Sequence, residues 1–131
     1  MNRIELLASL CQGSHMVCDV GCDHAYVLIK AIKSYGVEHG IACDIAEGPL
    51  RMAKKSIQDN GLEAEIDLCL SDGFSNVEAE FDTAVIAGMG GTLITEILLK
   101  HLDKLSNKKL ILQANNDRYK LRKFLYMHGF K

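Results

Sequence analysis

The chain has 131 residues, of which 48% are hydrophobic and 24% charged, and its formal net charge is −2. This length predicts one globular domain, and no apolar run is long enough to span a bilayer. The charge excludes a surface that is basic all over, so a partner rich in phosphate would need local patches of lysine and arginine. Residues 1–10 resemble an amphipathic helix more than a signal peptide, and we therefore expect a cytoplasmic protein.

Short runs of apolar and β-branched residues predict five strands, at 16–20, 40–45, 64–70, 82–87 and 109–113. Segments with helical spacing lie between or beside them. The helix after the second strand opens with Gly48-Pro49, and proline suits a first helical turn, where its missing N–H is not needed. Strands that alternate with helices pair in parallel through right-handed crossovers. The pattern predicts an α/β fold with a doubly wound, mostly parallel sheet covered on both faces.

Five cysteines make an odd number in a chain without an export signal. Cys18, Cys43 and Cys69 fall inside predicted buried strands, where a free thiol behaves as a small hydrophobe. Cys18, Cys22 and His24 are close enough in sequence to raise the question of zinc. Their spacing lacks a second ligand pair, and Cys18 should point into the sheet. We expect no metal site.

The residues directly after each predicted strand are the most informative ones for function. In an open parallel sheet, ligands bind beyond the carboxyl ends of the strands, where the strand order reverses. The candidate binding residues at these strand ends are Asp19, Gly21, Asp23, His24, Asp44, Ile45, Asp72, Gly73, Gly88, Met89 and Gly90.

The acidic residues among them separate the candidate ligands. A nicotinamide dinucleotide needs a glycine-rich turn that brings its pyrophosphate to a helix N-terminus. Here the G-x-G-x-x-G pattern is absent, and Asp19 and Asp23 flank Gly21, where two carboxylates would repel a pyrophosphate. A cofactor with a sulfonium cation, an amino group and a ribose but no phosphate suits these residues better. S-adenosylmethionine has those features.

The other strand ends fit the same cofactor. Asp44 is placed to accept hydrogen bonds from both ribose hydroxyls, and Asp72 to accept one from the adenine amino group. Each aspartate alone has an alternative role as a helix cap or turn residue. Gly88 and Gly90 serve either as turn residues or to let a ligand approach the backbone. Met89 belongs either to the core or to the pocket wall.

Several segments together resemble the bacterial tRNA (adenine(22)-N(1))-methyltransferase family. They cover nearly the whole chain and include D-V-G-C-D-H-A-Y (19–26), C-D-I-A-E-G-P-L (43–50), S-D-G-F (71–74), I-A-G-M-G-G (86–91), L-I-L-Q-A-N (110–115) and L-R-K-F-L-Y-M-H-G-F (121–130). The resemblance implies the Rossmann-like core of a class I S-adenosylmethionine-dependent methyltransferase. Cys22 stands where the family usually has serine or threonine, and Ala114 where it has proline.

The resemblance also implies the reaction, which is methyl transfer to N1 of an adenine in tRNA. The candidate catalytic residues are Asp23, His24, Tyr26 and Asn115. His24 has an alternative role in hydrogen bonding to the backbone, and Tyr26 either packs or stacks on the base. Two other functions stay open: a small-molecule methyltransferase, although no substrate-loop insertion is visible, and a non-catalytic cofactor-binding remnant.

The family pattern continues into two closing strands and a helical domain, whereas this chain stops at Lys131. We therefore expect residues 1–131 to be the S-adenosylmethionine-binding domain without those parts. The last predicted strand then becomes an exposed sheet edge, which favours self-association or capture of a partner strand. Beyond it, Arg118 and Arg122 share a helix face with Lys123 beside them. This face either contacts phosphates or is an ordinary solvated surface.

Overall fold

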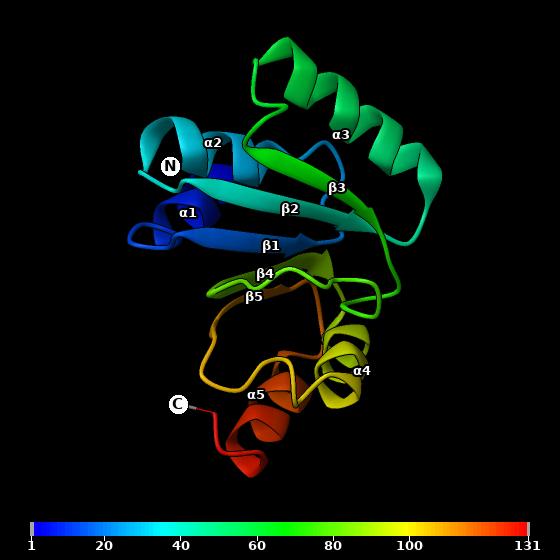
Figure 1. Cartoon of the computed structure of the whole chain (residues 1–131). Helices are drawn as coiled ribbons and strands as arrows, with labels where there is room; N and C mark the ends of the chain where they lie inside the picture. Colours follow the sequence, from blue (N-terminus) through cyan, green and yellow to red (C-terminus); the bar gives the residue numbers. More distant parts are fainter. Residues whose placement is uncertain (1, 131) are drawn as a thin grey trace.

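The computed structural model of the chain describes residues 2–130, and the helices and strands within them alternate for most of the chain (Figure 1). Met1, part of the predicted N-terminal helix, lies outside the described residues. The elements are α1 (Arg3–Leu10), β1 (Met16–Val20), α2 (Tyr26–Ser34), β2 (His39–Asp44), α3 (Glu47–Asp59), β3 (Ile66–Leu70), β4 (Thr83–Met89), α4 (Gly91–Lys100), β5 (Lys109–Ala114) and α5 (Arg118–Met127).

The five strands form one sheet in the order β3-β2-β1-β4-β5, and every neighbouring pair is parallel. The chain moves outward from β1 to β3 and then returns to pair β4 with β1, so the strand order reverses between β1 and β4. This confirms the predicted doubly wound α/β fold. It also places the reversal, where ligands bind in such sheets, at the carboxyl ends of β1 and β4.

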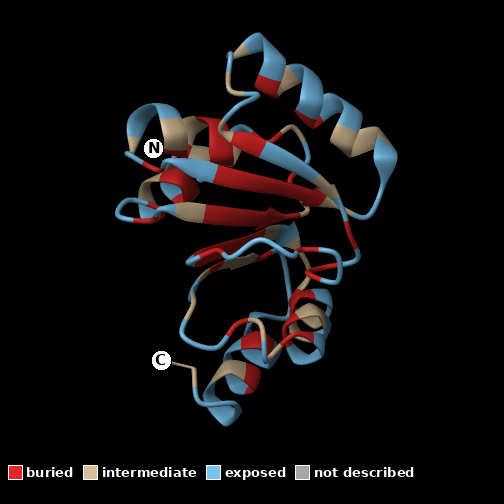
Figure 2. Ribbon diagram, viewed as in Figure 1, coloured by how far each residue is buried: buried red, intermediate tan, exposed pale blue. Residues whose placement is uncertain are grey.

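Helices cover both faces of the sheet, and the core is split accordingly. Val17 and Val85 pack with residues of α1, α2 and α3, whereas their chain neighbours Cys18 and Ile86 pack with residues of α4 and α5. Side chains alternate between the two faces of a strand, so a central strand with helices on both sides must be apolar throughout. That is why β1 and the first half of β4 are almost entirely buried (Figure 2).

The outer strand β3 differs from the prediction. It begins at Ile66, two residues later than expected, and only that residue of the strand is buried. Cys69 is partly exposed, so the prediction that it lies in a buried strand is wrong. The reason is position: β3 is an edge strand, paired only with β2, and an edge strand is less fully covered than a central one.

The first and third helices begin as the sequence indicates. Helix α1 starts at Arg3 because the Asn2 side chain accepts a hydrogen bond from the Glu5 N–H at 2.8 Å, which caps the helix. Helix α3 starts at Glu47 and carries Gly48 and Pro49 in its first turn. None of the helices within residues 2–130 is long and apolar enough to cross a membrane.

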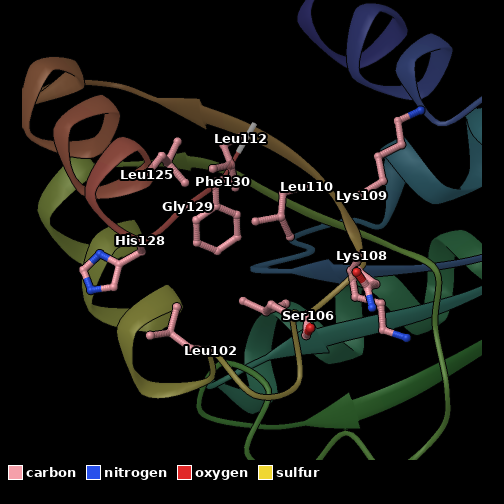
Figure 3. A pocket seen from close by; sticks show the side chains of 12 residues that line it. Leu102, Ser106, Lys108, Lys109, Leu110, Leu112, Leu125, His128, Gly129 and Phe130 are labelled. Carbon is pink, nitrogen blue, oxygen red and sulfur yellow. The ribbon is translucent and has the colours of Figure 1, made fainter.

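The opposite edge strand, β5, pairs only with β4, as predicted. A hollow of about 730 Å³ lies beside it, between the loop after α4 and the end of α5. Leu110, Leu112, Leu125 and Phe130 face this hollow (Figure 3). Its lining includes lysines and a histidine but no carboxylate. The hollow therefore runs along the β5 edge, has both apolar and polar lining residues, and lies apart from the acidic strand ends.

A close backbone contact holds the start of α4 against the loop after β5. The Gly91 N–H donates to the Asn116 carbonyl oxygen at 3.0 Å. A Cβ atom on Gly91 would lie only 2.4 Å from the Asp117 carbonyl oxygen. Because both partners are backbone, neither can rotate away, and position 91 requires glycine.

We predict that Gly91→Ala lowers the free energy of unfolding by about 1–3 kcal/mol, the usual cost of overpacking. Gly48→Ala is the matched control, since Gly48 also lies in a first helical turn but has no atom within 4 Å of its Cβ position except Arg51 Nη2 at 4.0 Å. This control should be neutral or stabilising, because alanine favours helix. Urea unfolding measures both, and equal midpoints would contradict the prediction.

Candidate functional site

The turn after β1 is compact and forms the floor of the candidate site. The N–H groups of Gly21 and Cys22 both donate to the Cys43 carbonyl oxygen at 2.9 Å, which ties this turn to β2. Gly21 has φ +76°, and a Cβ there would lie 2.9 Å from Met89 Cε. The position therefore requires glycine for its backbone angle and for the methionine packed on it. Met89 packs both against this turn and against the core cluster on the α4 side of the sheet.

A small hollow of about 60 Å³ opens above this turn. The structure brings five predicted site residues together in the lining of this hollow: Asp19, Gly21, Asp23, His24 and Tyr26. The rest of the lining comes from α1, from the residues next to these five, and from Ala87 of β4. The hollow is far smaller than a typical cofactor pocket of several hundred Å³. Only one end of a cofactor would fit inside it.

Asp19 is the buried charge of this hollow. Its side chain is 4% exposed. Burial raises the pKa of its carboxyl to about 7; the Arg3 charge acts against this, and Asp44 and Asp23 add to it. The Arg3 guanidinium that offsets its charge donates its own hydrogen bond to Gln113 Oε1. A charged carboxylate is costly to bury. Its position suits a ligand that brings a cationic N–H group.

Arg3 of α1 is a residue of this hollow that sequence reasoning missed. Its Nη1 donates to Gln113 Oε1 at 3.1 Å, and the same oxygen accepts from the Gly88 N–H at 2.9 Å. Gln113 Nε2 in turn donates to Asn115 Oδ1 at 3.2 Å. One amide thus connects α1 with the ends of β4 and β5. Arg3 belongs to no recognisable motif. The only feature of the sequence that could have indicated a role for it is its positive charge on the helix before the first strand.

Gly88 lies where the register of β4 and β5 shifts, which is a β-bulge. Its φ of +80° is in the left-handed region, as the extra residue of a bulge often is. A Cβ on it would approach Arg3 Nη1 to 3.2 Å. At Gly90, a Cβ would lie 2.6 Å from Asn116 Oδ1. Gly88 thus has the backbone angle of a turn residue, and the Asn116 side chain occupies the space beside Gly90.

The end of β2 presents a carboxylate and an exposed apolar side chain. Asp44 is half-buried, and its Oδ1 accepts from the Ala46 N–H at 3.1 Å. Its Oδ2 has no such contact among the described residues. Ile45 beside it is 69% exposed. A turn that fixes one oxygen of Asp44 leaves the other available to a ligand.

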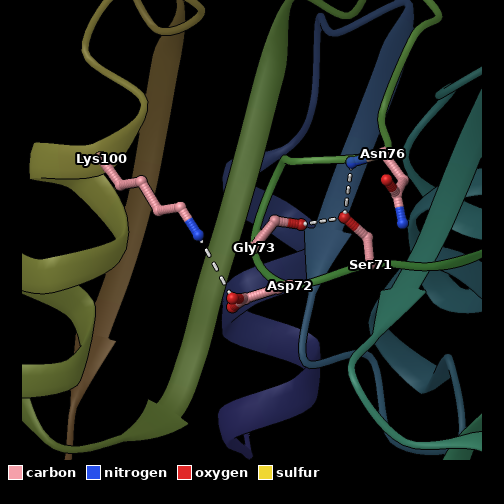
Figure 4. Close-up of polar contacts among 5 residues, drawn as sticks. All are labelled: Ser71, Asp72, Gly73, Asn76 and Lys100. Atoms are coloured by element: carbon pink, nitrogen blue, oxygen red, sulfur yellow. Dashed lines mark hydrogen bonds and ion pairs between the residues drawn. The ribbon is translucent and has the colours of Figure 1, made fainter.

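Asp72 lies in the loop directly after β3. Its carboxylate pairs with Lys100 Nζ of α4 at 3.2 Å (Figure 4). Next to it, the buried Ser71 hydroxyl donates to the Gly73 carbonyl oxygen at 2.8 Å and accepts from the Asn76 N–H at 3.0 Å. The loop is therefore fixed internally, while Asp72 points toward α4. An exposed ion pair of this kind is weak and can be exchanged for a ligand contact.

The candidate catalytic side chains lie on two strand ends. The His24 and Tyr26 rings stack with centroids 5.0 Å apart and planes 9° apart. His24 Nε2 lies 3.9 Å from Asp23 Oδ1. Among residues 2–130, no backbone group forms a hydrogen bond with the His24 ring. The ring is held by stacking on Tyr26. Asn115 is exposed after β5, and its N–H donates to the Met89 carbonyl oxygen at 2.9 Å.

In the described part of the chain, no three side chains of His, Cys, Asp or Glu lie close enough to hold a metal ion. Four of the five cysteines, all except Cys69, are buried. Cys18 and Cys43 Sγ atoms are 3.6 Å apart in the core, and the pKa of the Cys43 thiol is raised by its contact with Cys18 and by burial.

The electrostatics of Asp19 give a pH-dependent prediction. Its folded-state pKa near 7 exceeds the ordinary value of 3.8, so the charged carboxylate destabilises the unliganded fold. The stability penalty is absent below about pH 4, grows as pH rises, and is complete above about pH 7. We predict that Asp19→Asn raises the free energy of unfolding at pH 8 by roughly 2–4 kcal/mol, at 1.36 kcal/mol per pKa unit.

The same substitution should give little gain at about pH 3, where the carboxyl is mostly protonated in both the folded and the unfolded chain. Denaturant unfolding at the two pH values measures the difference. Asp67→Asn on the exposed edge strand β3 is the matched control and should change little at either pH, because its carboxylate is exposed. A gain of the same size at both pH values would show that burial of charge is not the cause.

Comparisons with known proteins agree with this geometry. A family model described as "Methyltransferase domain" matches residues 1–131. The tRNA (adenine(22)-N(1))-methyltransferase of Bacillus subtilis is 36% identical over 130 residues, which cover 98% of this chain and 55% of that protein. The chain spans between 55% and 59% of the length of the curated relatives it matches.

Solved structures are similar in fold as well as sequence. Streptococcus pneumoniae Sp1610 in complex with S-adenosyl-L-methionine has a TM-score of 0.93 at 39% identity, over 98% of this chain and 62% of that one. M. capricolum TrmK in complex with S-adenosyl-homocysteine has a TM-score of 0.86 at 30% identity, over 98% and 57%. With a parallel doubly wound sheet, acidic strand ends and a family model that matches its whole length, this chain belongs to the methyltransferase-domain family.

Proposed function

We propose that this chain is the S-adenosylmethionine-binding domain of a methyltransferase that modifies N1 of an adenine in tRNA. The observation that carries the proposal is the buried Asp19 carboxylate at the strand ends, which lines the same hollow as Arg3. Support comes from the printed name of the Bacillus subtilis relative and from the cofactor complexes of the similar structures.

The small hollow suits the amino-acid end of the cofactor. The Asp19 carboxylate would accept a hydrogen bond from the cofactor's ammonium group, either directly or by way of the neighbouring Gly21 and Asp23. Arg3 would bind the cofactor's carboxylate. The nucleoside would then lie over the open strand ends. There Asp44 would accept from the ribose hydroxyls, with Ile45, Asp72, Gly73 and the segment 88–90 around the base. This division explains why a hollow of about 60 Å³ is sufficient.

The proposed reaction is a displacement in which adenine N1 forms a bond to the methyl carbon as the carbon–sulfur bond breaks. S-adenosylmethionine supplies the activated methyl group and leaves as a neutral thioether. N1 lies on the Watson–Crick edge, so the target base must be unpaired before this chain can hold it. Most of the catalysis is then positioning of the two reactants.

The side chains for this positioning lie beside the hollow. Tyr26 is 49% exposed and already stacks on His24, so the pair would form an aromatic surface for the base. Asn115, oriented by Gln113, would bind the base edge. The methylated base is cationic, and the exposed Asp23 carboxylate would stabilise it. The proposed substrate is consistent with a cytoplasmic location.

Methyl transfer tests the proposed function directly. We expect the chain to bind S-adenosyl-homocysteine in calorimetry and to transfer labelled methyl groups to unmodified tRNA, with the product mapped to N1 of one adenine. Small-molecule acceptors are the control and should stay unlabelled. Transfer to small molecules alone, or cofactor binding without any transfer, would contradict the proposal.

Arg3 gives a sharper test of the cofactor's orientation. We predict that Arg3→Met weakens binding of S-adenosyl-homocysteine by about 10- to 100-fold, because a charged hydrogen bond to its carboxylate is lost. Binding of 5′-methylthioadenosine, which lacks the amino-acid group, should not change. The control is Lys33→Met, which removes a cation from α2 outside the hollow. Equal losses for the two ligands would contradict this orientation.

We also propose that the free edge of β5 pairs with a second copy of the chain. Its unpaired backbone groups and the leucines of the adjacent hollow provide the surface. Sedimentation velocity should show association that increases with protein concentration. Leu110→Lys on β5 should abolish it, since an edge lysine opposes pairing, whereas Leu68→Lys on the edge strand β3 should not. A monomer at every concentration would contradict this proposal.

A further inference from the structure

The outward face of α5 carries two exposed aromatic rings in line. Tyr119 is 73% exposed and Tyr126 is 85% exposed. They are seven residues apart, which is two helical turns or about 10 Å along the helix axis, so they point in nearly the same direction. Arg122 and Lys123 lie between them in sequence and are also exposed. We call these four residues the α5 stripe.

The stripe is not needed for the packing of α5. Leu121 and Phe124 on the opposite side of the helix are buried in the core cluster that also contains residues of α4. The outward side is exposed along its length (Figure 2). Single exposed apolar side chains are common on proteins. Two large rings aligned on one helix face, with cations between them, are the arrangement expected of a binding surface.

Charge on this helix is one-sided. Its sequence, RYKLRKFLYM, has four cations and no carboxylate, in a chain with a net charge of −2. Five of the ten cations elsewhere in residues 2–130 form ion pairs: Lys30, Arg51, Lys55, Lys100 and Lys108. Among residues 2–130 no ion pair involves α5. The helix therefore concentrates uncompensated positive charge.

The first turn of α5 lies close to the candidate site. Helix α5 begins three residues after Asn115, and the loop between them packs on the start of α4 through the hydrogen bond from Gly91 to Asn116. Lys120 Nζ lies 3.4 Å from Thr92 Oγ1 in the same region. A ligand strand that leaves the strand ends over α4 would therefore meet the first turn of α5.

We infer that the α5 stripe binds single-stranded RNA next to the target base, an inference that rests on the proposed function. Bases stack on Tyr119 and Tyr126, and Arg122 and Lys123 contact the phosphates between them. Stacking on aromatic rings requires unpaired bases, which matches a target that must itself be unpaired. A membrane surface fits less well, because the apolar side of α5 is buried in the core.

Paired variants separate stacking from charge. Tyr119→Ala with Tyr126→Ala should weaken binding of a single-stranded RNA oligonucleotide by tenfold or more, since stacking contributes about 1–3 kcal/mol per base. Tyr119→Phe with Tyr126→Phe keeps both rings and should bind within about twofold of the parent chain. The alanine pair should still fold, because alanine favours helix, and an unchanged affinity for S-adenosyl-homocysteine checks this.

The charge variant is Arg122→Gln with Lys123→Gln. It should reduce the slope of log affinity against log salt by about 1.4, or 0.7 per lost phosphate contact to a single strand. Arg51→Gln with Lys55→Gln on α3 removes the same charge from the other side of the sheet and should leave the slope unchanged. Tyrosine fluorescence reports binding, because the chain has four tyrosines and no tryptophan.

The outcomes divide cleanly between the stripe and the proposed function. If the alanine pair binds RNA as well as the parent chain, or if the parent chain binds anionic vesicles or acidic peptides but not RNA, the inference is overturned. In methyl transfer the alanine pair should raise KM for tRNA and leave kcat unchanged. If the alanine pair transfers methyl groups with an unaltered KM for tRNA, the inference about the stripe is wrong and the proposed function stands. If the parent chain binds RNA through the stripe but transfers no methyl group, the proposed function is wrong and the inference about RNA binding stands.

Discussion

The Asp19 carboxylate is buried near the end of a central strand, and most features of the strand ends relate to it. Strand β1 lies between β2 and β4 and is covered on both faces, so a charge there loses most of its hydration. Parallel strands end at one edge of a sheet, which brings Asp44 and Asp23 near enough to raise the Asp19 pKa further. The Arg3 charge offsets this only in part. The fold thus maintains an unfavourable charge at the place where a cationic ligand would relieve it.

Such a site needs a rigid frame, and here the frame is built from backbone contacts. The carbonyl oxygen of Cys43 accepts from two N–H groups of the β1 turn, and the Gln113 amide connects α1 with the ends of β4 and β5. Met89 leaves no room for a side chain at Gly21, and the backbone of Asn116 and Asp117 leaves none at Gly91. Small residues at the strand ends are therefore explained by how closely the loops approach one another, before any ligand is considered. Rigidity of this kind holds binding groups in place without further ordering.

The two ends of the sheet have different surfaces. On the β3 side, the charges of α3 are largely paired with one another, as in Arg51 with Glu47 and Lys55 with Asp59. On the β5 side, an apolar edge lies beside a helix with uncompensated cations and exposed tyrosines. A nucleic acid held at the strand ends would therefore extend toward α5 and not toward α3. The same side also offers the free edge for pairing between copies, so RNA and a second copy would approach neighbouring surfaces.

The sequence by itself determined the alternation of strands and helices, the central buried strands and the acidic residues at their ends. It could do so because hydrophobic period and turn residues are local properties that a few neighbours decide. It also indicated that β5 lies at an edge, although that rested on a family resemblance. The exposure of Cys69 was misjudged, because an apolar run does not reveal whether its strand is central or outer.

Only the tertiary structure decided which groups meet. Arg3 contacts Gln113 across 110 residues of sequence, Asp72 pairs with Lys100, and Asn116 fills the space beside Gly90. Each contact depends on the order of strands in the sheet and on the angle at which a helix leaves its strand. Neither is encoded in a short window of residues, since both result from packing the whole chain around one core.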